Sequence, residues 1–132
     1  MTGTFVVVDD DPGMRRSLAR VIQHFWPQAN VEQFSGLDQI RRASLPTDIG
    51  VVISDYELGT VDTGLDVLEH FANVPVRVLF TGALQMAQAD LRIRQEGGKL
   101  SGVLVASKAE AAFVERAGLV DIIRAGRRIA KK

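Results

Sequence analysis

The sequence predicts one α/β domain built around a parallel β-sheet. Short apolar runs rich in β-branched residues alternate with longer segments whose apolar residues recur at helical spacing, and such alternation is typical of βαβ units. The run Ile49–Ser54 is almost continuously apolar, as expected for a central strand covered on both faces. A chain of 132 residues suits one hydrophobic core, so we expect a single domain spanning residues 1–132.

The first strand is predicted at residues 5–8 and leads into an amphipathic helix. Asp11 can cap this helix and Pro12 suits its first turn, while Pro27 ends it. Five apolar residues fall on one face of the helix and are expected to point inward: Met14, Leu18, Val21, Ile22 and Phe25. A second strand is predicted at residues 31–34.

The middle of the chain adds two helices and two strands. A short helix is expected at residues 37–43, before the strand Ile49–Ser54. A further amphipathic helix, which closes near Pro75, is indicated by Leu65, Leu68, Phe71 and Ala72. The fourth strand is predicted at residues 76–80.

The last third of the chain repeats the pattern. Helical spacing of Leu84, Ala87 and Leu91 indicates a fourth helix, and residues 102–106 indicate the fifth strand. The last helix is expected to start near Ala109 and to point these residues inward: Phe113, Ala117, Val120 and Ile123. Leu119 and Ile122 widen its apolar surface, so the helix is either deeply packed or offers a face to an output protein or a second copy of the chain.

Polar side chains follow four of the five predicted strands. Asp9 and Asp10 follow the first, Asp55 the third, Thr81 the fourth, and Lys108 stands shortly after the fifth. Because ligands bind where parallel strands deliver their carboxyl ends, we expect these side chains to converge. Crowded carboxylates repel one another unless a cation joins them, and Mg²⁺ prefers oxygen ligands. One carboxylate can then attack phosphorus, while a lysine and a hydroxyl stabilise the phosphoryl charge.

Four stretches of the chain resemble the receiver domain of bacterial response regulators. They are FVVVDDDPGMRR at 5–16, VVISDYEL at 51–58, VRVLFTG at 76–82, and the late Lys108, in the right order and at suitable spacing. The match covers essentially the whole chain. The resemblance implies a flavodoxin-like, doubly wound fold, in which five helices flank a five-stranded parallel sheet of order 2-1-3-4-5.

The resemblance also implies a role for each matching residue. Asp55 corresponds to the phospho-acceptor, while Asp9 and Asp10 correspond to the acidic pair that holds Mg²⁺, with Asp10 the direct ligand. The backbone carbonyl of Glu57 is implied as a further metal ligand.

For the remaining site residues, Thr81 corresponds to the hydroxyl that closes onto the phosphate and Lys108 to the family's lysine. The implied phosphoryl donor is a sensor histidine kinase or a histidine phosphotransfer protein. A single-domain, chemotaxis-type receiver of this kind catalyses its own phosphorylation and dephosphorylation and then switches its protein contacts; it is not an enzyme acting on a separate substrate.

The chain departs from the receiver pattern at three positions. Ala109 and Gly59 stand where the family usually has proline, and Val105 stands where it usually has tyrosine or phenylalanine. The loop from Asp55 to Gly64 is also one residue longer than usual. Because an aliphatic side chain cannot swing a ring between buried and exposed states, the output step is expected to be muted or to use another element.

Two other functions fit parts of the sequence. A receiver-like adaptor would bind a partner without phosphorylation, as Val105 and Ala109 allow. A phosphatase of the haloacid-dehalogenase type needs a second aspartate two residues after its nucleophile, and Asp9 and Asp11 have that spacing. Pro12 and the following glycine, however, stand where that class has a turn containing threonine.

Composition restricts the partners. The 16 basic and 16 acidic residues give a net charge of zero, so no overall field steers the chain to nucleic acid or a membrane, and neither is expected to bind. The basic residues at the end are expected to be solvated: Arg124, Arg127, Arg128, Lys131 and Lys132. His24 and His70 lack metal-ligand spacing and are expected to be structural or surface residues. The absence of cysteine suits a cytoplasmic location.

Overall fold

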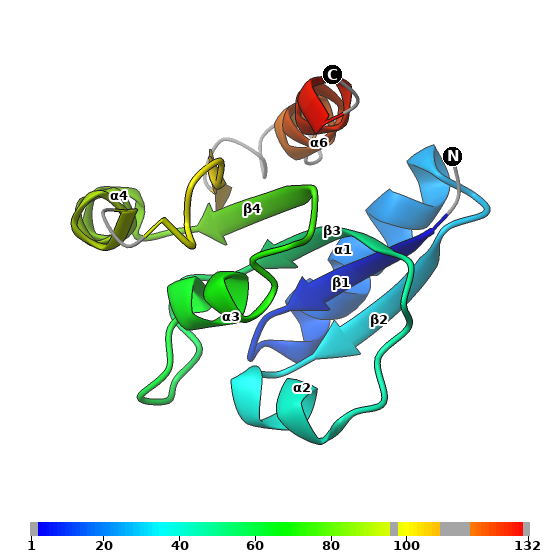
Figure 1. Cartoon of the computed structure of the whole chain (residues 1–132). Helices are drawn as coiled ribbons and strands as arrows, with labels where there is room; N and C mark the ends of the chain where they lie inside the picture. Colours follow the sequence, from blue (N-terminus) through cyan, green and yellow to red (C-terminus); the bar gives the residue numbers. More distant parts are fainter. Residues whose placement is uncertain (1–2, 96–97, 109–116, 131–132) are drawn as a thin grey trace.

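Five parallel strands form one sheet in the order β2-β1-β3-β4-β5 (Figure 1). The structure is a computed structural model and describes residues 3–95, 98–108 and 117–130. Every neighbouring pair is parallel. The strands are β1 (Thr4–Val8), β2 (Asn30–Phe34), β3 (Ile49–Ser54), β4 (Val76–Thr81) and β5 (Leu104–Ser107). The predicted α/β class, strand number and strand order are confirmed.

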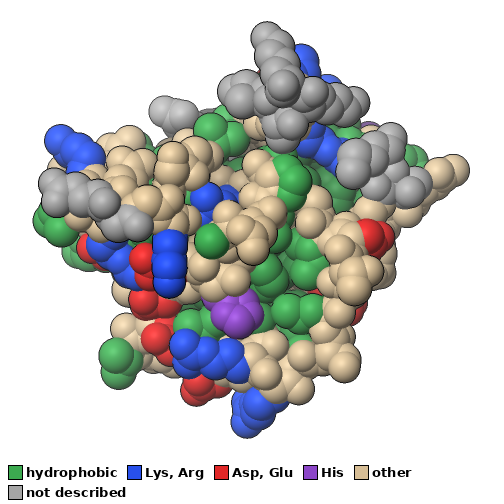
Figure 2. Space-filling view, in the orientation of Figure 1, with side chains coloured by type: hydrophobic (Ala, Val, Ile, Leu, Met, Phe, Trp, Pro, Cys, Tyr) green, Lys and Arg blue, Asp and Glu red, His purple; other side chains and the backbone are tan. Residues whose placement is uncertain are grey.

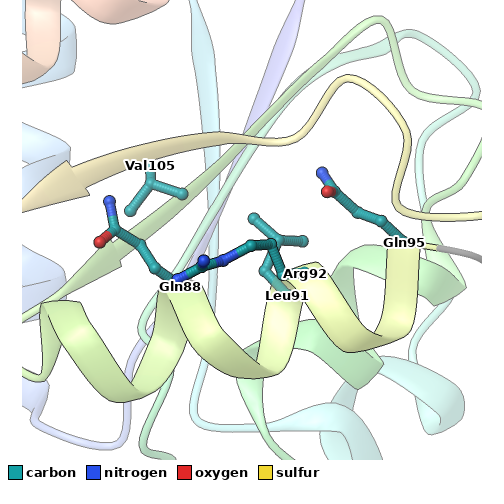
Figure 3. Close-up of a pocket in the computed structure, with 5 residues that line it drawn as sticks. All are labelled: Gln88, Leu91, Arg92, Gln95 and Val105. Carbon is teal, nitrogen blue, oxygen red and sulfur yellow. The ribbon is translucent and has the colours of Figure 1, made fainter.

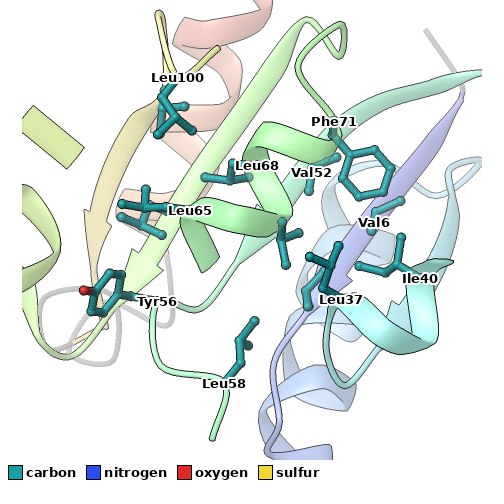
Figure 4. Packing of buried hydrophobic residues seen from close by; sticks show 14 of the residues in the cluster. Val6, Leu37, Ile40, Val52, Tyr56, Leu58, Leu65, Leu68, Phe71 and Leu100 are labelled. Carbon is teal, nitrogen blue, oxygen red and sulfur yellow. The ribbon is translucent and has the colours of Figure 1, made fainter. Parts of the chain in front are cut away.

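Helices cover both faces of this sheet. Within the described ranges they are α1 (Pro12–Phe25), α2 (Leu37–Arg42), α3 (Gly64–His70), α4 (Leu84–Arg94) and α6 (Ala117–Ala130). One buried cluster joins the sheet to α1 and α6, and the other joins it to α2, α3 and α4. Figure 4 shows part of the second cluster, to which Leu65 and Leu68 of α3 and Val6 and Val52 of the strands belong. This is the predicted doubly wound arrangement.

Strand β3 occupies the centre of the sheet, as its apolar run predicted. Val51 and Ile53 belong to the cluster under α1 and α6, while Val52 belongs to the opposite cluster. All three side chains are buried, because successive residues of a strand point to opposite faces and both faces are covered here.

Helices α1 and α3 start at defined caps. The Asp11 carboxylate accepts hydrogen bonds from the backbone N–H groups of Gly13, at 2.9 Å, and Met14, at 3.4 Å. Thr63 and Asp66 form a reciprocal capping box at the start of α3. The predicted capping role of Asp11 is confirmed.

Two local predictions are wrong. The fifth strand starts at Leu104, two residues later than predicted, because Gly102 has a φ of 82° and the Val103 N–H bonds to the Leu100 carbonyl in a turn. Phe25 was expected to point inward, yet it is 38% exposed. Trp26 packs against Phe5 in its place, with ring centroids 5.1 Å apart.

The last helix is packed rather than free along its apolar side. Leu119, Val120 and Ile123 are buried, and Ile122 packs against the same cluster. The deeply packed alternative therefore accounts for its apolar surface. The expected start near Ala109, Phe113 and the Ala117 side chain lie outside what the structure describes.

The described surface carries charges of both signs. On the face seen in Figure 2, basic and acidic side chains are interspersed, in line with the net charge of zero. His24 and His70 are both exposed, which agrees with their prediction as surface residues. None of the described helices is long and apolar enough to cross a membrane.

Candidate functional site

The carboxylates of Asp9, Asp10 and Asp55 meet at the carboxyl edge of the sheet. Strands β1 and β3 are neighbours in which Val8 is paired with Ser54, and the Asp55 N–H donates a 2.8 Å hydrogen bond to the Val8 carbonyl. This pairing sets the residues that follow the two strands beside each other. One carboxylate oxygen from each of the three aspartates lies within 4.8 Å of the others.

Lys108 links two of these carboxylates. Its Nζ lies 2.9 Å from Oδ2 of Asp9 and 3.1 Å from Oδ2 of Asp55. The ammonium therefore offsets part of the repulsion between the two acids, and the sequence had placed it at the same edge.

The environment shifts the pKa values of Asp55 and Lys108. Burial raises the pKa of Asp55, the charge of Lys108 opposes that rise, and the charge of Asp9 adds to it. Burial acts to lower the pKa of Lys108, but the hydrogen bond to Asp9 and the charge of Asp55 together raise it. Lys108 is thus held as a cation, and a further positive ligand near Asp55 would favour the charged form of that carboxylate.

Asp9 and Asp10 differ in their surroundings although they are adjacent in the sequence. Asp9 is buried, and its Oδ1 accepts a 3.0 Å hydrogen bond from the Asp11 N–H while its Oδ2 accepts from Lys108. Asp10 is exposed and makes no hydrogen bond or ion pair with any residue that the structure describes. The Asp10 carboxylate is therefore the one whose oxygens are open to an incoming ligand.

A pocket of about 280 Å³ adjoins this cluster. It is lined by Asp55, Glu57, Thr81, Gly82, Ala83 and Lys108. Thr81 Oγ1 accepts a 2.8 Å hydrogen bond from the backbone N–H of Ala83, which is the N-cap residue of α4. The pocket thus extends from the carboxylates to the start of α4.

The donor set fits Mg²⁺. Three carboxylates with one ammonium leave two negative charges, and every candidate ligand atom is an oxygen, as a hard divalent cation requires. Asp10 and Asp55 offer carboxylate oxygens, and Glu57 lines the adjoining pocket. The residues at this edge therefore fit a divalent cation.

Asp11 does not join the cluster. Its carboxylate caps α1, as described above. Among the described residues, the acids close enough together to hold one metal ion are Asp9, Asp10 and Asp55. Asp11, the second aspartate of the spacing that suggested a haloacid-dehalogenase pair, therefore caps a helix.

The departures from the receiver pattern have structural correlates. Gly59 has a φ of 70°, which proline cannot adopt because its ring holds φ near about −65°. Val105 is half-buried and lines a groove of about 340 Å³ against α4, with Gln88, Leu91, Arg92 and Gln95 (Figure 3). Ala109 lies outside the residues that the structure describes.

One contact beside Asp55 was not predicted from the sequence. The hydroxyl of Tyr56 donates a 2.9 Å hydrogen bond to Oδ2 of Asp90 on α4. Burial and the hydrogen bond to Asp90 raise the pKa of Tyr56, so the hydroxyl keeps its proton at neutral pH. A buried tyrosine directly after Asp55 was the available signal, but its partner lies 34 residues further along the chain.

No protein-family model and no curated protein matches the chain. Solved structures do match. The chain aligns with RcsB, seen as two dimers bound to two parallel DNAs, at a TM-score of 0.68 and 14% identity, covering 97% of this chain and 61% of RcsB. It aligns with the receiver domain of HemR from Leptospira biflexa at 0.63 and 20% identity, covering 92% and 94% of the two chains.

A third match shows the same architecture. The BeF₃-activated receiver domain of DrrB, a response regulator of Thermotoga maritima, aligns at a TM-score of 0.63 and 16% identity, covering 94% of this chain and 99% of that one. The chain has the fold of a response regulator receiver domain. It spans nearly all of the isolated receiver domains but less than two thirds of the longer RcsB chain.

Proposed function

We propose that residues 1–132 form one phosphoryl-accepting receiver domain of a two-component system. Asp55 accepts a phosphoryl group from a histidine kinase or a histidine phosphotransfer protein. Asp10, Asp55 and the Glu57 carbonyl bind Mg²⁺ directly, and Asp9 adds negative charge beside them and pairs with Lys108. The observation that carries the proposal is the position of Lys108, whose ammonium lies within 3.1 Å of both Asp9 and Asp55 beside the pocket.

In the transfer step an oxygen of Asp55 forms a bond to phosphorus. The bond from phosphorus to the imidazole nitrogen of the donor breaks, and the imidazole keeps the electron pair. Bound Mg²⁺ supplies positive charge to the phosphoryl oxygens. Lys108 supplies a second positive charge, and the Thr81 hydroxyl, whose oxygen accepts from the Ala83 N–H, borders the pocket as a hydrogen-bond donor.

Reversal of the signal uses the same edge of the sheet. Water attacks phosphorus on the side opposite Asp55, the bond between phosphorus and the Asp55 oxygen breaks, and that oxygen leaves as the carboxylate, stabilised by Lys108. The domain thus promotes both steps on its own side chain. This is the activity of a signalling domain rather than of an enzyme with a separate substrate.

The direct test is the intact mass of the chain after incubation with acetyl phosphate, with and without Mg²⁺. We expect the mass of one PO₃ unit to be added in the presence of Mg²⁺, no addition to Asp55→Asn, and normal addition to Asp121→Asn, which changes an exposed aspartate on α6. If neither acetyl phosphate nor a phosphorylated histidine phosphotransfer protein adds mass, the proposal is wrong. The adaptor function then becomes the better account.

A second readout uses beryllofluoride, with which the DrrB receiver domain was activated. With Mg²⁺ present, BeF₃⁻ is expected to shift the backbone amide signals of Thr81 and Ala83, since both border the pocket. The same addition to Asp55→Asn is expected to leave those signals in place.

A further inference from the structure

Helix α4 is attached to the rest of the domain largely by polar contacts. Of its eleven residues only Ala87 and Leu91 are buried. Arg94, near its end, forms a 2.9 Å ion pair with Asp66 of α3 and a second ion pair with Glu69. Between these points Asp90 accepts the hydrogen bond from Tyr56. A helix with so little buried apolar surface can change position at low cost when a polar contact changes.

Tyr56 connects this helix to the acceptor residue. Its backbone N–H acts to lower the pKa of the Asp55 carboxylate, and its carbonyl accepts a 2.9 Å hydrogen bond from the Gly64 N–H. The residue is only 8% exposed and belongs to the same buried cluster as Ala87 and Leu91. One end of Tyr56 therefore touches Asp55, and the other end touches Asp90 of α4.

The pocket beside Asp55 reaches α4 by a second route. Ala83, the N-cap of α4, lines the pocket and donates its N–H to Thr81 Oγ1. A phosphoryl group on Asp55 carries roughly 1.5 to 2 negative charges in place of the single charge of the carboxylate, and added negative charge is favourable at a helix N-terminus. Phosphorylation thus attracts the first turn of α4 toward the pocket.

Building on the proposed function, we propose that the hydrogen bond from Tyr56 to Asp90 holds α4 in its unphosphorylated position and breaks when Asp55 is phosphorylated. Tyr56 cannot follow the helix, because its backbone is fixed by Gly64 and its ring is packed in the core. A hydrogen bond weakens steeply once its length or angle changes, so a shift of α4 separates the two groups.

This contact gives the domain an output route that does not need an aromatic residue on β5. Val105, on that strand, has no hydroxyl and no ring. Tyr56 instead provides the aromatic side chain that reaches from the acceptor to α4. Two residues are thereby assigned a regulatory part: Tyr56 as the sensor of the acceptor and Asp90 as its contact on the moving helix.

The sequence offers a selective probe, because Tyr56 is the only tyrosine in the chain. Biosynthetic labelling with 3-fluorotyrosine therefore gives a single ¹⁹F resonance. We expect Mg²⁺ with acetyl phosphate to shift this resonance in the wild type. In Asp90→Ala the resonance is expected to be displaced already before phosphorylation and to move little afterwards, although the intact mass still rises. Gln85→Ala, which changes an exposed residue of the same helix, is the matched control and is expected to behave as the wild type.

Hydrogen exchange tests the unphosphorylated contact by itself. Loss of one hydrogen bond of about 1 kcal/mol corresponds to roughly fivefold faster opening, so the α4 amides of Tyr56→Phe and Asp90→Ala are expected to exchange about fivefold faster than those of the wild type. Equal α4 exchange in both variants and the wild type would overturn the inference. So would a mass gain in the wild type with an unmoved ¹⁹F resonance, which would leave the proposed function standing. Absence of any mass gain would instead overturn the proposed function, and this inference with it.

Discussion

The Nζ atom of Lys108 lies 2.9 Å from Oδ2 of Asp9, although the two residues are 99 positions apart in the sequence. Strands β3 and β4 lie between the strands that carry them. The same Nζ atom lies 3.1 Å from Oδ2 of Asp55 and 5.9 Å from the centroid of the Phe80 ring. A single side chain thus connects the two ends of the site.

Replacing Lys108 is expected to destabilise the chain and abolish phosphoryl uptake. Lys108→Met keeps the apolar stem but leaves Asp9 and Asp55 without their shared cation. A buried carboxylate that loses its partner costs about 1–3 kcal/mol, so the free energy of unfolding in urea should fall by that amount at pH 7. Lys99→Met, at an exposed lysine, serves as control. Equal losses for both variants would argue against the bridging role.

Asp55 is expected to make metal-free stability depend on pH. Its folded-state pKa is raised above 3.8, chiefly by burial. The folded chain then binds the proton more tightly than the unfolded chain, so the contribution of Asp55 is fully present below pH 3.8 and is lost as the pH rises through the folded-state pKa. Asp55→Asn removes this loss and should be more stable than the wild type by about 1 kcal/mol at pH 7, measured by urea unfolding with a chelator.

Mg²⁺ should reverse that order. At a free Mg²⁺ concentration of 100 times the Kd, the ion is expected to stabilise the wild type by about 2.7 kcal/mol. It should stabilise Asp55→Asn considerably less. Asp121→Asn, the exposed control, should follow the wild type with and without Mg²⁺. If Asp55→Asn is less stable than the wild type at every pH without metal, the charged carboxylate of Asp55 does not destabilise the folded chain as its burial indicates.

Gly64 is expected to tolerate no side chain. A Cβ at this position would lie 2.1 Å from the carbonyl oxygen of Asp55 and 2.8 Å from its carbonyl carbon, so Gly64→Ala forces α3 away from the acceptor loop. We expect a loss of about 1–3 kcal/mol in the free energy of unfolding and weaker phosphoryl uptake. Gly118→Ala, in α6 with open space around it, should instead gain about 0.5–1 kcal/mol. The opposite signs of the two changes in the free energy of unfolding distinguish a steric clash at Gly64 from the usual effect of replacing glycine with alanine in a helix.

Helices α1 and α6 are joined by arginines stacked on aromatic rings. The guanidinium of Arg127 lies 5.4 Å from the Phe5 ring and 5.6 Å from the Trp26 ring, while that of Arg124 lies 5.3 Å from the Phe25 ring. Arg127→Ala is expected to lower the free energy of unfolding by about 1–2 kcal/mol. It should also change the fluorescence of Trp26, the only tryptophan.

Arg128→Ala is the matched control for this contact, since Arg128 is exposed on the same helix. Its unfolding curve and its Trp26 fluorescence should match those of the wild type. If Arg127→Ala leaves both properties unchanged as well, the stacking contributes nothing measurable to the docking of α6.

The sequence was sufficient for the fold and for the meeting of the site residues, because both follow from periodicity and strand ends. Once Phe5 to Val8 and Ile49–Ser54 are neighbouring parallel strands, the acids that follow them must lie together. The same logic places Thr81 and Lys108 at that edge. No pattern in the sequence separates buried Asp9 from exposed Asp10, since that difference depends on Lys108 and Asp11 as partners.

Side-chain contacts between elements that are distant in the chain could not be predicted from the sequence. Arg77 lies within an apolar strand pattern, yet its guanidinium is buried and donates to the backbone carbonyls of Leu68, Lys99 and Ser101. The hydrogen bond from Tyr56 to Asp90 is of the same kind. Such pairs depend on the final placement of helices and turns, which local spacing does not encode.

The proposed function depends on one metal site beside Asp55, formed by carboxylates that are remote from one another in the sequence. Paramagnetic Mn²⁺, titrated into ¹⁵N-labelled protein, locates such a site through the broadening of nearby amide signals. The account predicts that the amides of Asp10, Asp55 and Glu57 broaden first, and that Asp10→Asn requires much more Mn²⁺ for the same effect. Broadening that starts elsewhere in the chain, or that is equal in the wild type and Asp10→Asn, would contradict it.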